Sequence, residues 1–139
     1  MKKILFLLPL LISCKSVDYT YHDSMTFQEA RSLHHKQIAT SDGRLFEARQ
    51  LFRAHQTHWP KTVEACDAVA REAEVEKFSM AMVINERGKV QDVLFNENGD
   101  KLTCYHENLV GKTYAQPPIS PWYQIVNVTV GSGTGFRTY

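Results

Sequence analysis

Residues 78–95 read FSMAMVINERGKVQDVLF, and this stretch decides the class of fold. Its first half alternates between two sets of side chains, as a half-buried β-strand does. The set expected to face the core is Phe78, Met80, Met82 and Ile84. Residues 85–88 follow as a polar turn in which Gly88 is free to take a positive φ. Because residues 89–95 are again rich in apolar side chains, the stretch predicts a β-hairpin.

The chain after the hairpin predicts one helix and one further strand. Asp100 is placed to cap a short helix, and Gly111 is placed to end it. A loop that contains three prolines then leads into an apolar run at residues 124–130, which predicts the last strand. The second half is therefore expected to form a small antiparallel sheet of ββαβ order.

The chain before the hairpin has helical periodicity from about residue 26 to residue 75. Thr26 and Glu29 have the spacing of a capping box, in which the two side chains satisfy each other's backbone N–H groups. Residues 41–43 (SDG) are expected to break this first helix and to cap a second helix that runs to about His55. Pro60 suits the first position of a third helix. The fold class predicted from the whole pattern is α+β, with N-terminal helices followed by the sheet.

The first 14 residues read as an export signal. Two lysines precede an apolar core at residues 4–12, which is too short to span a membrane because a spanning helix needs about 20 residues. Residues 11–14 (LISC) resemble the bacterial lipobox, in which a small residue precedes the cysteine that receives a lipid. The resemblance implies removal of residues 1–13 and acylation of Cys14 with diacylglycerol and palmitate. The alternative is an ordinary signal peptide with an incidental cysteine. Because Lys15 rather than Asp follows Cys14, lipoprotein sorting favours the outer membrane, facing the periplasm.

The remaining chain has the size of one domain. Removal of residues 1–13 leaves 126 residues, with 14 basic and 15 acidic side chains. This near-neutral balance gives no electrostatic support for binding nucleic acid. We expect a short tether at residues 14–25, one domain at residues 26–130 and a flexible tail at residues 131–139.

Three cysteines are present, and the lipid would occupy Cys14. Cys66 and Cys104 are left as a pair in an oxidising compartment, where disulfides form. We therefore expect a Cys66–Cys104 disulfide. The alternatives are two buried free thiols or one reactive thiol.

Residues 76–130 resemble the C-terminal domain of TonB-family proteins. The resemblance lies in residues 82–93 (MVINERGKVQDV), in Tyr114 with the prolines after it, and in the final strand. It implies a small sheet with a helix on one face and an exposed edge that pairs with an extended segment of a partner protein. The long proline-rich spacer of the family's energy-transducing members is absent, so the resemblance is carried to the fold and not to that role.

Few residues suggest chemistry. His55 and His58 have a spacing that suits half of a zinc or copper site, and the alternative is histidines at the surface or at an interface. Cys104 and His106 lie two positions apart, so on a helix they would not face each other as nucleophile and base.

Two aromatic residues, Trp122 and Tyr123, follow the proline-rich loop and are candidates for a contact surface, with core packing as the alternative.

The sequence contains no recognised catalytic or nucleotide-binding motif and implies no cofactor. We therefore expect a non-enzymatic, membrane-anchored lipoprotein that binds or recruits another envelope protein. The second hypothesis is a lipoprotein that binds a metal or small ligand through His55 and His58.

Overall fold

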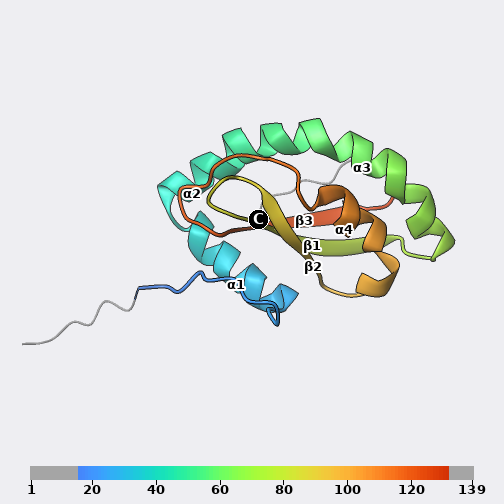
Figure 1. The fold of residues 1–139 in the computed structure, drawn as a ribbon, viewed down its shortest axis with the longest axis horizontal. Coiled ribbons are helices and arrows are strands. Elements are labelled where there is room, and N and C mark those ends of the chain that lie inside the picture. The colour runs from blue at the N-terminus through green and yellow to red at the C-terminus, as the bar shows by residue number, and fades with distance from the viewer. Residues whose placement is uncertain (1–15, 132–139) are drawn as a thin grey trace, which may run out of the picture.

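The computed structural model describes residues 16–131. Its sheet has three antiparallel strands in the order β2–β1–β3 (Figure 1). The central strand is β1 (Lys77–Ile84), which pairs with β2 (Val90–Phe95) on one side and with β3 (Trp122–Thr129) on the other. The predicted combination of helices with a three-stranded antiparallel sheet is confirmed.

Helices cover both faces of this sheet. One face packs against α1 (Phe27–Ile38), and the other packs against α3 (Phe52–Glu72) and α4 (Thr103–Leu109) (Figure 1). The expectations of helical cover on one face of the sheet and of a half-buried first strand are therefore wrong. The reason lies in β1, where Ala81 and Val83 are completely buried against the α1 side. Apolar residues thus occupy both sides of the central strand.

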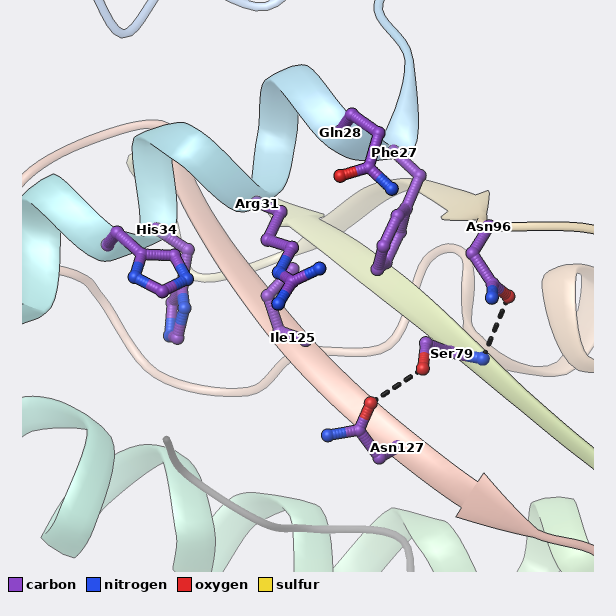
Figure 2. A pocket seen from close by; sticks show the side chains of 9 residues that line it. Phe27, Gln28, Arg31, His34, Ser79, Asn96, Ile125 and Asn127 are labelled. Carbon is purple, nitrogen blue, oxygen red and sulfur yellow. Dashed lines mark hydrogen bonds between the residues drawn. The ribbon is translucent and has the colours of Figure 1, made fainter.

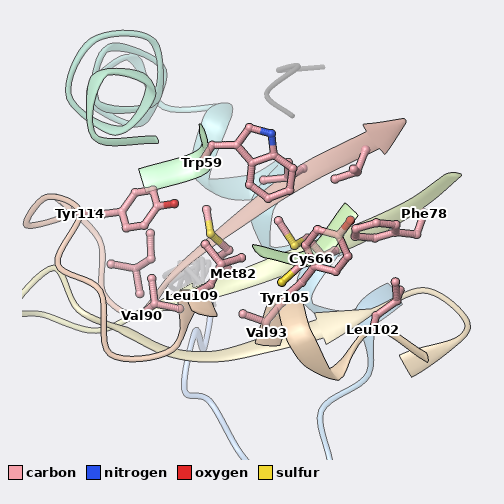
Figure 3. Close-up of a cluster of buried hydrophobic side chains, with 14 of the residues drawn as sticks. Trp59, Cys66, Phe78, Met82, Val90, Val93, Leu102, Tyr105, Leu109 and Tyr114 are labelled. Atoms are coloured by element: carbon pink, nitrogen blue, oxygen red, sulfur yellow. The ribbon is translucent and has the colours of Figure 1, made fainter. Parts of the chain in front are cut away.

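The larger core lies between the sheet and the layer formed by α3 and α4 (Figure 3). Tyr105 of α4 is its centre, with ring centroids 4.9 Å from Phe78 and 6.0 Å from Trp59. In the same layer Cys66 of α3 and Cys104 of α4 lie at disulfide distance, with their Sγ atoms 2.07 Å apart. The expected cysteine pairing therefore joins the two helices over the sheet.

The first helix begins as predicted. Thr26 Oγ1 accepts a hydrogen bond from the N–H of Glu29, and Glu29 Oε2 accepts one from the N–H of Thr26. The helix ends near Ala39, and the side chain of Thr40 caps α2 (Ser41–Leu45). The next helix therefore begins at Ser41, within the expected break, and its capping residue lies one position before that break.

The following helical region differs from the prediction. A π-helical segment, η1 (Phe46–Leu51), leads directly into α3, which continues through Pro60. The expected helix start at Pro60 is wrong. A proline within a helix leaves the carbonyl four residues earlier without its N–H partner, and here that carbonyl belongs to the exposed residue Gln56, where water can bind it.

The hairpin turn follows its sequence signals. Asn85 Oδ1 accepts hydrogen bonds from the N–H groups of Arg87 and Lys89. Gly88 has a φ of 81°, and a Cβ there would lie 2.6 Å from the carbonyl carbon of Ala115. After β2 come a short 3₁₀ helix, η2 (Gly99–Lys101), and then α4.

Residues 16–25 have no regular secondary structure, but their side chains pack on the domain. Tyr19, Tyr21 and Met25 join the apolar cluster beneath α1. Tyr123 Oη donates a 2.5 Å hydrogen bond to the carbonyl oxygen of Tyr19, and Tyr21 Oη donates to Asp92. Much of the expected tether therefore lies against the sheet. The signal segment, Cys14 and residues 132–139 lie outside the described residues.

Candidate functional site

The outer edge of β3 is a place where another strand could pair. In an antiparallel ladder, consecutive residues direct their N–H and C=O groups alternately toward and away from the neighbouring strand. The N–H of Tyr123 donates to a side chain rather than to β1, so it points outward. The same alternation directs the backbone groups of Ile125 and Asn127 outward as well. Among residues 16–131 the sheet has no fourth strand beyond β3.

Gln37 closes the beginning of this edge. Its Oε1 accepts a 3.0 Å hydrogen bond from the N–H of Tyr123, and its Nε2 donates a 2.8 Å bond to the carbonyl oxygen of Pro121. One carboxamide therefore satisfies a backbone donor and a backbone acceptor, as a peptide group of a neighbouring strand would. Gln37 is fully buried, so water does not replace it.

A buried polar cluster continues this closure. Gln124 Nε2 donates to the carbonyl oxygen of Ile125 at 3.0 Å and to Glu47 Oε1 at 2.7 Å. The same Glu47 oxygen lies 3.0 Å from His34 Nε2, and Trp122 Nε1 donates to Gln124 Oε1. Glu47 belongs to the π-helical segment η1, a type of helix that often occurs at functional sites. The cluster fixes α1, η1 and the first half of β3 relative to one another.

Farther along the edge, Asn127 has no such closure among the described residues. The structure records no side chain within the described range that caps the outward N–H of Asn127. The burial of β3 also falls along its length, from the completely buried Trp122 to the partly exposed Asn127 and the exposed Thr129. The side-chain closure seen at Tyr123 is therefore not repeated at Asn127.

A pocket of about 370 Å³ lies beside the open part of the edge (Figure 2). Its lining comprises Phe27, Gln28, Arg31, His34 and His35 of α1, with Ser79, Asn96, Ile125 and Asn127 of the sheet region. Because Ile125 and Asn127 belong to both features, a segment bound at the edge would pass the mouth of the pocket.

The histidines proposed as a metal half-site have other contacts. His55 is 2% exposed and its Nδ1 lies 3.0 Å from Tyr114 Oη. Burial lowers the pKa of His55 to about 3, so its ring is neutral at physiological pH. His58 Nε2 lies 2.8 Å from the carbonyl oxygen of Thr113. A metal ion at these two nitrogens would have to displace both contacts.

The alternative expectation of a surface or interface position is wrong for His55, which is buried against Trp59, whereas His58 is partly exposed. In the described part of the chain, no three His, Cys, Asp or Glu side chains are grouped as a metal site.

The aromatic contact surface predicted after the proline-rich loop is not at the surface. Trp122 and Tyr123 are completely buried on opposite faces of the sheet, because the strand begins earlier than expected. Core packing, the alternative for these residues, is what the structure supports. Burial raises the pKa of Tyr123 to about 12.

His106 does not form a nucleophile–base pair with Cys104, whose sulfur is at disulfide distance from Cys66. Its Nε2 instead lies 2.8 Å from Asp92 Oδ1, while the other oxygen of Asp92 accepts from Tyr21. This contact joins α4 to β2 and to the N-terminal segment.

Sequence reasoning missed the residues that shape the edge and the pocket, namely Gln37, Glu47, Gln124, Arg31 and Asn127. Gln124 and Asn127 offered a weak signal, since polar side chains in an apolar strand require partners when buried. Gln37 and Glu47 are indistinguishable in sequence from solvent-facing helical residues, because their partners lie far away along the chain.

Comparison with known proteins gives no further guide: no family model, curated protein or solved structure matches this chain. Within residues 16–131, no helix is both long and apolar enough to cross a membrane.

Proposed function

We propose that this chain is a lipid-anchored protein of the bacterial envelope that binds an extended segment of a partner protein along the open half of the β3 edge. The observation that carries this proposal is the contrast between the two halves of β3. Gln37 accepts from the outward N–H of Tyr123 and Gln124 donates to the outward carbonyl of Ile125, whereas no side chain of residues 16–131 caps the outward N–H of Asn127. Strand addition takes affinity from main-chain hydrogen bonds and specificity from the side chains that alternate along the added strand.

The TonB-family resemblance supports the same mode of binding. We propose that β1, β2, α4 and β3 correspond to the ββαβ order of that family's C-terminal domain. The three antiparallel strands and the edge position of β3 support this correspondence. The extra cover of α1 on the second face is a departure from the one-sided helical cover that the resemblance implies.

The anchor is the other part of the proposal. The lipobox at residues 11–14 supports acylation of Cys14 and attachment to the outer membrane, facing the periplasm. Two or more acyl chains give stable attachment, since each buried methylene contributes about 0.8 kcal/mol. Full-length protein labelled with radioactive palmitate should sediment with membranes. The Cys14→Ser variant should lose both the label and the sedimentation.

The edge is tested by photo-cross-linking in the cells that produce the protein. A photoreactive amino acid at Thr129, beside the open edge, should give a discrete cross-linked partner. The same amino acid at Val69, which is 48% exposed on α3, should not capture that partner.

Proline substitution then shows whether main-chain pairing is responsible. Asn127→Pro removes an N–H that points away from β1, so it leaves the existing ladder intact. Asn127→Ala retains the N–H. Loss of the cross-link in the proline variant alone supports strand addition, provided that both variants unfold at similar temperatures. Equal cross-linking in both variants would refute it.

A further inference from the structure

The pocket beside β3 has an apolar floor and a polar wall. Phe27 and Ile125, which are 7% and 8% exposed, form the floor between α1 and the sheet. The wall consists of side chains that carry nitrogen and oxygen atoms, and no Asp or Glu lies among the lining residues. The character of the pocket therefore depends on whether these groups present donors or acceptors.

Ser79 orients two of the wall amides. Its backbone N–H donates a 2.9 Å hydrogen bond to Asn96 Oδ1, and its hydroxyl donates a 2.6 Å bond to Asn127 Oδ1 (Figure 2). Each carboxamide oxygen thereby accepts one hydrogen bond from Ser79. The Nδ2 group of each asparagine, which only donates, has no partner among the described residues, and Figure 2 shows the Nδ2 of Asn127 directed away from Ser79.

Arg31 adds a permanent positive charge. Figure 2 shows its side chain extending from α1 over Ile125 toward β3. Its guanidinium has five N–H donors in a planar fork, and no acceptor in residues 16–131 is recorded as bonded to it. The pocket is thus rich in donors, carries a cation and lacks a carboxylate of its own.

From this arrangement we infer that the pocket binds a carboxylate group. The guanidinium fork matches the two oxygens of a carboxylate, and the Nδ2 groups of Asn127 and Asn96 supply further donors in the same pocket. Arg31 is the one arginine or lysine among the lining residues. Its charge balances the single charge of a carboxylate better than that of a phosphate monoester, which approaches two at neutral pH.

The inference deepens the proposed function, since the open edge adjoins the pocket through Asn127. An extended segment added to β3 would place an Asp or Glu side chain, or its terminal carboxylate, over Arg31. The identification of the carboxylate's source rests on the proposed strand addition. Binding of a carboxylate by the pocket does not.

The test is an NMR titration of the purified, ¹⁵N-labelled full-length protein with sodium acetate, with sodium chloride and sodium phosphate as separate arms at matched ionic strength. Acetate should shift the side-chain signals of Arg31, Asn96 and Asn127 along a saturable curve. Arg31→Gln should weaken acetate binding about tenfold or more, because it removes charge-assisted hydrogen bonds. Arg31→Lys, which keeps the charge but loses the fork, should weaken it by a smaller factor.

The matched control is Arg53→Gln, which removes an exposed arginine of α3 and should leave acetate binding unchanged. Shifts in acetate that do not exceed those in chloride, or that are unaffected by Arg31→Gln, would overturn the inference. Tighter Arg31-dependent binding of phosphate than of acetate would also overturn it in favour of a phosphate site. None of these outcomes depends on strand addition, which the proline variant at position 127 tests separately.

Discussion

Replacement of Gln37 by alanine should destabilise the protein far more than the loss of an ordinary polar side chain. The variant loses the donor for Pro121 O and the acceptor for Tyr123 N–H, which lie 2.8 Å and 3.0 Å from the Gln37 amide. Leaving a buried polar group without a partner costs about 1–3 kcal/mol. Two such groups give an expected loss of about 2–6 kcal/mol in the free energy of unfolding.

The assay is equilibrium urea unfolding of the full-length protein followed by circular dichroism, with Gln56→Ala as the control. Gln56 is an exposed residue of α3, so its variant should remain within about 0.5 kcal/mol of wild type. The midpoint for Gln37→Ala should fall while the slope with urea remains similar. A loss of less than about 0.5 kcal/mol for Gln37→Ala would refute the argument that the Gln37 carboxamide satisfies backbone groups that a neighbouring strand would otherwise satisfy.

Two further measurements address the core. The Cys66→Ser, Cys104→Ser double variant should lose up to about 4 kcal/mol of stability, because the cross-link restricts the unfolded chain over a separation of 38 residues; equal thermal stability would show that the bond is absent or without effect. Stability should also fall below pH 6.5 by up to about 1.4 kcal/mol per pH unit, because burial lowers the pKa of His55 to about 3 and the unfolded state therefore binds the proton first. Urea unfolding measured at several values from pH 7 to pH 4 gives the free energy of unfolding at each pH. That free energy should fall less steeply with decreasing pH in His55→Phe than in wild type, and an identical pH dependence would contradict this assignment.

Much of the local structure could be predicted because its causes are local. The capping box of Thr26 and Glu29, the turn at Gly88 and the two strands of the hairpin each depend on residues that are neighbours in the sequence. The predicted helix start at Pro60 is wrong because a proline is tolerated inside a helix where the carbonyl that it leaves unpaired is exposed.

The candidate site could not be predicted because it depends on distant contacts. Gln37 pairs with residues 84 and 86 positions later, and Glu47 meets Gln124 across 77 positions. Nothing in the helical pattern around Gln37 distinguishes it from a residue that faces water. The packing of α1 against the sheet could not be predicted either, because small apolar residues such as Ala81 and Val83 occur on partly exposed as well as on fully buried faces.

Under the proposed function, β3 would serve both as part of the core and as a binding edge. In the first half of β3, side chains bond the outward N–H of Tyr123 and the outward carbonyl of Ile125, and the aromatic residues are buried. At Asn127, beside the pocket, no side chain of the described residues caps the outward N–H. A protein that binds by strand addition needs such a division, because a fully open edge would pair without selectivity.

Backbone amide hydrogen exchange of the isolated full-length protein, followed residue by residue by NMR, tests the central claim most directly. The account predicts strong protection of the Tyr123 amide, which Gln37 holds, and rapid exchange of the Asn127 amide on the same edge. Equal and strong protection of both amides would show that the edge of β3 is closed along its whole length and would contradict binding by strand addition.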